Sequence, residues 1–116
     1  MITEENRYQL RTLVEAIREG SKLRPQCYWR FYSNGGSCVL GAAAEHMGKQ
    51  EEIESKDISI CNLWPVMNIS HFHHQPCPCC FHAHGSLSIT VVELNDNHRW
   101  TREQIADWLE TLSRKE

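Results

Sequence analysis

The sequence has no excess of basic residues, because its 12 Lys and Arg are outnumbered by 15 Asp and Glu, for a formal net charge of −3. Neutralising a phosphate backbone takes a surplus of cations, so nucleic acid is disfavoured as a partner. A long apolar run is missing as well. The longest candidate, residues 39–44, includes a glycine and falls far short of the roughly 20 residues of a membrane-spanning helix. The sequence therefore gives no support to a membrane role.

The first ten residues, MITEENRYQL, lack both the positive segment and the apolar segment of a secretory signal peptide. We therefore expect a cytoplasmic protein. In a reducing cytosol, clustered cysteines and histidines more often bind metal or carry out chemistry than form disulfides. The six cysteines of the chain are accordingly expected to be reduced.

A length of 116 residues, 41% of them apolar, and the lack of internal repeats predict one globular domain over residues 1–116. We expect a mostly helical α+β fold with a short β-hairpin and a zinc-finger-like module of a knuckle and a helix. Residues 1–48 hold an N-terminal helix, the hairpin and a helix rich in Gly and Ala. Residues 49–76 form a connector with one short helix, and residues 77–116 hold the knuckle module and the C-terminal helix.

Three patterns predict the elements of the N-terminal part. Residues 3–19 carry apolar side chains on one helical face, and Gly20 is placed to follow the helix as its C′ residue. The aromatic run in residues 27–38 is broken by Asn34-Gly35-Gly36, which is the composition of a tight hairpin turn. Residues 38–48 repeat apolar and small side chains at helical spacing, which indicates a buried helix.

In the C-terminal part, residues 87–95 are rich in β-branched side chains, yet Ser86 is a good N-cap and the apolar positions recur at helical intervals. We therefore favour a helix over a strand. The last helix follows Thr101, which forms a capping box with Gln104. Trp108 belongs to the inward stripe of that helix and is expected to be buried.

Cys77 and Cys80 enclose two residues, a spacing that lets two thiolates bind one tetrahedral zinc ion. Twelve residues separate Cys80 from Glu93, and four separate Glu93 from His98. This is the spacing of a zinc finger with a glutamate in the first histidine position, and carboxylate oxygen is an accepted zinc ligand. The sequence therefore predicts a structural Zn²⁺ site whose ligands are Cys77, Cys80, His98 and Glu93.

The fourth ligand stays open, because other imidazoles lie near the knuckle. His82 and His84 follow it, and His73 and His74 precede it. Cys79 is interpreted as a bystander thiol, since adjacent cysteines rarely point at one ion. A redox-active pair of the thioredoxin type is disfavoured, because the sequence lacks the βαβ pattern in which that motif occurs.

Two stretches, Gly36-Ser37-Cys38-Val39-Leu40-Gly41-Ala42-Ala43 and Leu94-Asn95-Asp96-Asn97-His98-Arg99-Trp100-Thr101, resemble a family of small, uncharacterised bacterial and phage proteins. Members with a Cys-Pro-x-Cys knuckle carry His-Leu-Asn-Asp-x-His, which would make both histidines ligands, whereas Glu93 stands in the first place here. The resemblance covers most of the chain except residues 49–76. It implies the fold and a zinc site and carries no established activity.

Four protein ligands would leave no open position for water or substrate, which is typical of structural zinc. We therefore predict a non-catalytic, zinc-stabilised adaptor or regulator that binds a protein partner. One alternative is a thiol hydrolase, with Cys38 as nucleophile at a helix start, His98 as base and Asn95 as the residue that orients it. Another alternative is a zinc protein that binds nucleic acid, which the acidic Glu103 and Asp107 of the last helix disfavour.

Overall fold

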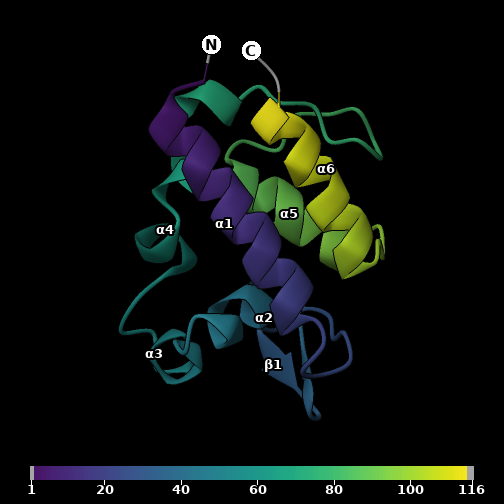
Figure 1. Ribbon diagram of the computed structural model, residues 1–116. Coiled ribbons are helices and arrows are strands. Elements are labelled where there is room, and N and C mark those ends of the chain that lie inside the picture. The colour runs from purple at the N-terminus through teal and green to yellow at the C-terminus, as the bar shows by residue number, and fades with distance from the viewer. Residues whose placement is uncertain (1, 115–116) are drawn as a thin grey trace.

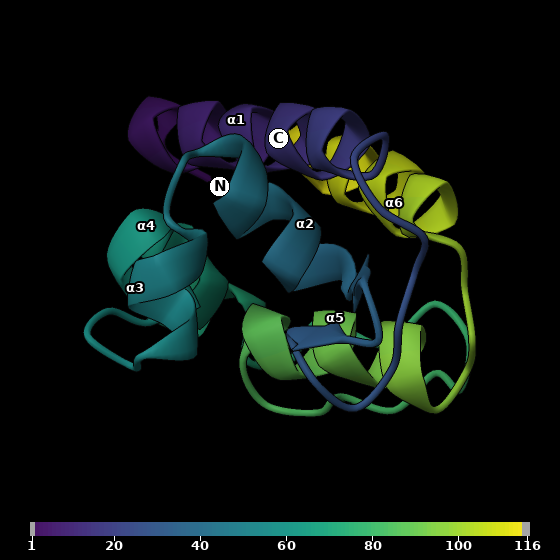
Figure 2. The ribbon, with the colours of Figure 1, turned by 90° about the horizontal axis from the view of Figure 1, so that it is seen from below.

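The computed structural model describes residues 2–114, and most of that chain is helical. Helix α1 (Glu4–Gly20) lies beside the antiparallel helix α6 (Arg102–Arg114) (Figure 1). Helix α2 (Val39–His46) packs against α1 on one side and against α5 (Leu87–Asp96) on the other (Figure 2). The predicted mostly helical α+β class is confirmed, and α2 is its central element.

Helix α1 begins where the sequence predicts, because the Thr3 Oγ1 accepts a hydrogen bond from the Asn6 amide at 3.1 Å. Its end was predicted wrongly. Gly20 is the last residue of the helix rather than the residue after it, and Ser21 caps the helix with a right-handed φ of −65°. A Cβ atom at Gly20 would lie 1.8 Å from the carbonyl oxygen of Ala42. The glycine therefore lets α1 approach the backbone of α2.

The predicted hairpin is present. Strand β1 (Tyr32–Ser33) pairs with the antiparallel strand β2 (Gly36–Ser37) across a two-residue turn. Asn34 and Gly35 form that turn with φ of 51° and 80°. Both values lie in the left-handed region, as a type I′ hairpin turn requires.

Helix α2 starts at Cys38, whose Sγ accepts a hydrogen bond from the Gly41 amide at 3.3 Å. All residues of 39–44 are buried, as the small and apolar composition predicts. A Cβ atom at Gly41 would lie 2.4 Å from the carbonyl oxygen of Phe31. The chain that leads into the hairpin therefore lies directly on α2.

The connector contains more structure than the single short helix that the sequence predicts. Its elements are the α-helices α3 (Gln50–Glu54) and α4 (Ile60–Leu63) and the 3₁₀ turns η1 (Pro65–Asn68) and η2 (Ser70–Phe72). Each is too short to produce a hydrophobic period. Tertiary contacts hold them instead: the Trp64 indole donates to the Thr12 hydroxyl at 3.1 Å, and Ile60, Val66 and Phe72 are buried.

Both predicted caps of the C-terminal part are confirmed. The Ser86 Oγ accepts from the Ile89 amide and starts α5 as a helix. The Thr101 Oγ1 accepts from the Gln104 amide at 3.1 Å, while the Thr101 amide donates to the Gln104 side chain at 2.8 Å. Trp108 is half-buried against the core rather than fully enclosed.

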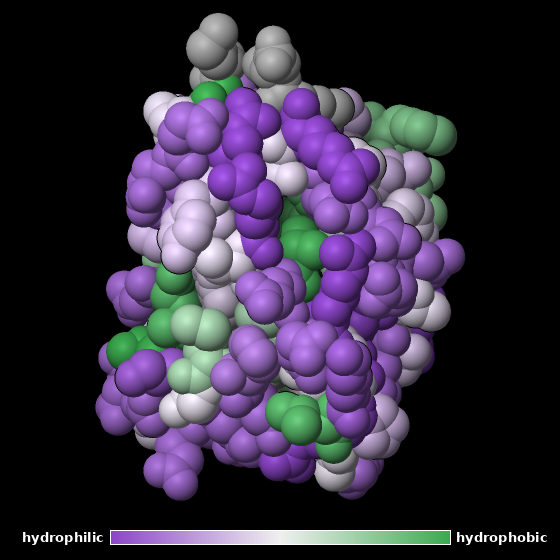
Figure 3. Space-filling view, in the orientation of Figure 1, coloured by the Kyte–Doolittle hydropathy of each residue, from purple (hydrophilic) through white to green (hydrophobic). Residues whose placement is uncertain are grey.

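The face formed by α1 and α6 is largely hydrophilic (Figure 3). Ion pairs cross it: Arg18 of α1 binds Glu103 and Asp107 of α6 at 3.0 and 2.6 Å. Within residues 2–114, none of the helices has both the length and the apolar character needed to span a bilayer.

Candidate metal centre

Two thiols and two imidazoles converge next to α5. One ligand atom from each of four side chains lies within 4.8 Å of the others; these side chains, called the Cys/His group below, are Cys77, Cys80, His84 and His98. Tetrahedral zinc with bonds of about 2.0–2.3 Å holds its ligand atoms roughly 3.3–3.8 Å apart. Shortening the longest separation between ligand atoms by about 1 Å would bring the group to that geometry. The four side chains are therefore close enough to bind one metal ion.

The two cysteines are positioned by a tight turn. The Cys77 amide donates to the His82 carbonyl at 2.9 Å, and the Phe81 amide donates to the Cys77 carbonyl at 2.9 Å. Phe81 adopts a left-handed φ of 66°, which reverses the chain directly after Cys80. The turn thereby directs both thiols to one side, as a zinc knuckle requires.

Cys77 is the enclosed member of the pair, with no exposed surface. Burial raises the pKa of its thiol, while the backbone amides of Cys80 and Cys79 oppose that shift by favouring the thiolate. A metal ion binds the thiolate form, so binding at this centre would release protons.

His84 comes from the loop between the knuckle and α5. Its Nε2 lies 3.2 Å from the Sγ of Cys80, and the imidazole is half-buried. Gly85 follows with a left-handed φ of 101° and returns the chain to Ser86, the N-cap of α5. The glycine therefore lets the ligand-bearing loop and the helix start follow each other without an intervening segment.

His98 comes from the link between α5 and α6. Its amide donates to the Glu93 carbonyl at 3.1 Å, and the Trp100 amide donates to the Leu94 carbonyl at 2.9 Å, so the link is bound to the last turn of α5. Arg99 has a left-handed φ of 55° that turns the chain toward α6. In Figure 2 the loop ahead of α5 runs along the helix, from the end where this link leaves it to the end where the helix begins.

The Cys/His group contains three of the ligands predicted from spacing, and its fourth member is His84, one of the alternatives left open. Glu93 is not in the group; its carboxylate accepts a hydrogen bond from the Asn97 side chain instead. His82 and Cys79 are exposed and also lie outside the group. A zinc finger takes two ligands from one helix, whereas here one imidazole precedes α5 and the other follows it.

The residues of the thiol-hydrolase alternative make other contacts in the structure. Burial raises the pKa of Cys38 to about 11, so its thiol is protonated at neutral pH. The Asn95 Oδ1 accepts from the Gln26 side chain at 2.9 Å and from the Val39 amide at 3.1 Å. Asn95 therefore joins α5 to α2 and to the loop before the hairpin, while His98 lies in the Cys/His group.

Sequence reasoning missed the buried Arg102. Its guanidinium donates to the Ser37 carbonyl at 3.1 Å and to the Arg24 carbonyl at 2.7 Å, and burial lowers its pKa. These bonds join α6 to the hairpin and to the loop that follows α1. Helical spacing could have predicted this burial, because residue 102 lies on the same face of the helix as Ile105 and Leu109, which are both buried.

No protein-family model, no curated protein and no solved structure matches this chain. The resemblance to small bacterial and phage proteins therefore stays a prediction. The chemistry of the site is therefore the basis on which a function is inferred.

Proposed function

We propose that the Cys/His group holds a structural Zn²⁺ ion and that the protein is a non-catalytic adaptor or regulator that binds a protein partner. The observation that carries the proposal is the convergence of two thiols and two imidazoles within 4.8 Å. Sulfur and imidazole nitrogen in a fourfold set are the donors of structural zinc. Four protein ligands leave no position for substrate, which supports a structural rather than a catalytic ion.

The ion would connect segments that are distant in the sequence. Cys77 and Cys80 lie on the knuckle, whereas His98 lies beyond α5. Since the unfolded chain has no preformed site, the free energy of zinc binding becomes free energy of folding. Zinc would thus fix the knuckle and the α5–α6 link to each other.

The proposed adaptor role is supported by aromatic side chains on the surface of a small domain. Trp29 and Phe31 are 63% and 39% exposed, and both line one hollow of the surface. Exposed apolar groups that gather on one surface are typical of contact sites. We also propose a cytoplasmic location, since thiolate ligands persist best in a reducing compartment.

Zinc content tests the proposal. Protein purified without chelator should contain about one zinc ion per chain, and Cys77→Ser should lose it because paired thiolates supply most of the affinity. Cys79→Ser is the matched control: this exposed thiol lies beside the knuckle pair, and the variant should keep its zinc. Elemental analysis by mass spectrometry measures both.

A structural ion also affects stability. A strong chelator should lower the melting temperature of the wild-type protein and leave that of Cys77→Ser unchanged. Wild-type protein that is folded and free of metal would refute the proposal.

A further inference from the structure

Phe31 lines three hollows of the surface, and Trp29 lines one of them. One of about 300 Å³ lies between Phe31, α4 and α5, and a second of about 210 Å³ lies between Trp29, Phe31 and Cys38. A third, of about 400 Å³, extends from Phe31 along the segment between α3 and α4. We call this surface the aromatic face; its apolar members are Trp29, Phe31, Leu40, Ile60, Ile89 and Val92.

Exposed apolar side chains are concentrated on the aromatic face. Of the eight large hydrophobic side chains that are exposed within residues 2–114, four belong to it; they are Trp29, Phe31, Ile89 and Val92. Isolated apolar residues on a surface need no explanation, whereas a contiguous set around a hollow marks a contact site.

The backbone holds the indole of Trp29 outward at a conformational cost. Trp29 has a left-handed φ of 72°, a region that bulky side chains rarely adopt. Its amide donates to the Asp96 carboxylate at 2.9 Å, and the Asn95 side chain binds the same oxygen at 2.7 Å. Strain of this kind is concentrated at functional sites, and here it displays an aromatic side chain rather than burying one.

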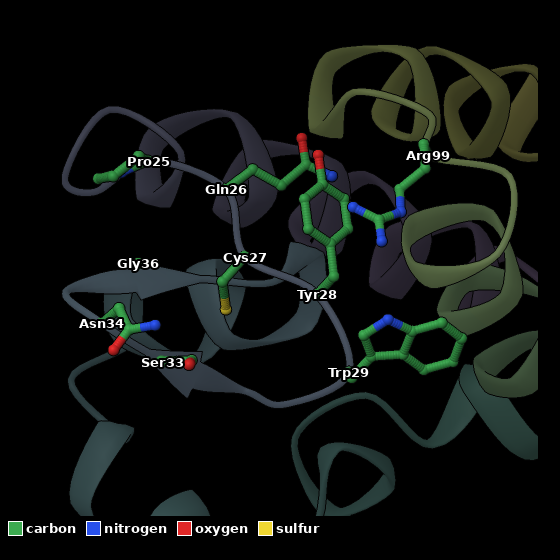
Figure 4. Close-up of a pocket in the computed structure, with 9 residues that line it drawn as sticks. All are labelled: Pro25, Gln26, Cys27, Tyr28, Trp29, Ser33, Asn34, Gly36 and Arg99. Atoms are coloured by element: carbon green, nitrogen blue, oxygen red, sulfur yellow. The ribbon is translucent and has the colours of Figure 1, made fainter.

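Three cations that form no salt bridge within residues 2–114 lie at the aromatic face or beside the hollow next to it. Arg30 lines the hollow beside Trp29, and Lys56 lines the hollow beside Phe31. Arg99 lies 3.9 Å from the ring centroid of Tyr28. Figure 4 shows Tyr28, Trp29 and Arg99 gathered on one side of an adjoining hollow of about 380 Å³, opposite Ser33 and Asn34.

Within residues 2–114, none of Arg30, Lys56 and Arg99 forms a salt bridge, although six other Lys and Arg residues do. Two carboxylates lie at the aromatic face. Asp57 shares a hollow with Lys56, and the Asp96 oxygen is occupied by the Trp29 amide. In a chain of net charge −3, three cations free of ion pairs around an apolar surface are complementary to an acidic ligand.

We propose that the aromatic face binds an acidic segment of a partner protein. Apolar side chains of the segment fill the hollows around Trp29 and Phe31, and its carboxylates pair with the three cations. The hollow between α4 and α5 has aliphatic walls, Ile89 and Val92, which accept apolar side chains and offer a nucleobase no plane for stacking. The inference rests on the proposed adaptor role and names the surface and the chemistry of the partner.

The test is selection from a displayed library of short random peptides against the purified full-length protein. Selected sequences should combine Asp or Glu with large apolar residues. Fluorescent synthetic copies should bind the wild-type protein, and Arg30→Glu should weaken them about tenfold through like-charge repulsion. Trp29→Gly should also weaken peptide binding about tenfold. The variant should keep the fold, because glycine adopts the left-handed φ readily.

Matched controls come from α1. Arg11→Glu reverses an exposed cation that also forms no salt bridge within the described chain, and Tyr8→Ala removes an aromatic side chain that is 58% exposed. Neither lies on the aromatic face, so peptide binding should be unchanged in both. Zinc content is measured in every variant, so that this inference and the proposed metal centre are tested separately. Acidic peptides that bind the wild type and bind Arg30→Glu and Trp29→Gly more weakly support the docking surface even if no zinc is found.

Selected peptides without acidic residues, or peptides whose binding is equal in the wild type, Arg30→Glu and Trp29→Gly, would overturn the inference. So would failure to select any binding sequence. Binding of a labelled oligothymidine that is lost in both variants, without binding of acidic peptides, would reassign the surface to single-stranded nucleic acid and would also overturn it.

Discussion

At the scale of single residues, the candidate metal centre differs from the one predicted by spacing in a single side chain, the fourth. Spacing along the chain identified Cys77, Cys80 and His98, because a two-residue knuckle and a downstream histidine are features of the sequence itself. The choice between His84 and Glu93 depends on backbone geometry. Left-handed φ values at Phe81 and Gly85 fold the loop so that His84 reaches Cys80, and spacing alone does not reveal them.

A variant series tests the fourth ligand. His84→Ala should weaken zinc binding by at least about tenfold, since it removes one of four ligands and leaves a position that only water can fill. Competition with a chromophoric chelator measures the affinity. Two variants serve as controls for His84→Ala. His82→Ala removes a nearby exposed imidazole, and Glu93→Gln removes the carboxylate that the zinc-finger spacing predicts as a ligand.

The zinc affinity of both control variants should lie within about twofold of the wild-type value, a much smaller change than the loss of a ligand causes. If Glu93→Gln weakened zinc binding strongly and His84→Ala did not, the ligand set predicted from spacing would be the correct one.

At the scale of secondary-structure elements, helix starts were predictable and close approaches were not. Thr3, Ser86 and Thr101 cap their helices as predicted, because capping is local and involves residues within one turn. Gly20 was misassigned because its role is a contact with Ala42, a residue far away in the sequence. The connector was underpredicted for the same reason, since tertiary burial holds its short turns.

The close approach of α1 and α2 yields a prediction. Gly20→Ala should lower the free energy of unfolding by about 3 kcal/mol, because its Cβ atom would clash with a backbone carbonyl that has no rotamer to change. For a domain of this size, that corresponds to a fall in melting temperature of roughly 10 °C or more. Thermal unfolding followed by circular dichroism measures it.

Glu15→Ala is the matched control, because Glu15 is an exposed residue of the same helix and the change should stay within about 0.5 kcal/mol. Equal stability of Gly20→Ala and Glu15→Ala would show that α1 and α2 separate freely and that the glycine is not required for their packing.

At the scale of the whole molecule, α5 connects the Cys/His group with the aromatic face. The link after its C-terminal end carries His98, Asp96 in its last turn binds the Trp29 amide, and its outer surface carries Ile89 and Val92. A zinc ion that fixes the end of α5 would thus also fix a wall of the proposed docking surface. Structural zinc in an adaptor would then act by ordering the surface that meets the partner.

The fold class of the whole molecule followed from the hydrophobic pattern, since helices and a hairpin turn have local signatures. The arrangement of those elements did not. That α2 lies between α1 and α5 depends on Gly20, Gly41 and the buried hydrogen bonds of Asn95, whose partners are distant in the sequence. The aromatic face could not be predicted either, because its members come from the segment before the hairpin and from α2, α4 and α5.

X-ray absorption at the zinc edge of the purified wild-type protein shows directly whether two cysteines and two histidines hold a zinc ion. We expect two sulfur ligands at about 2.3 Å and two imidazole nitrogens at about 2.0–2.1 Å. A spectrum without sulfur in the coordination shell, or with a carboxylate oxygen in place of the second imidazole, would contradict it.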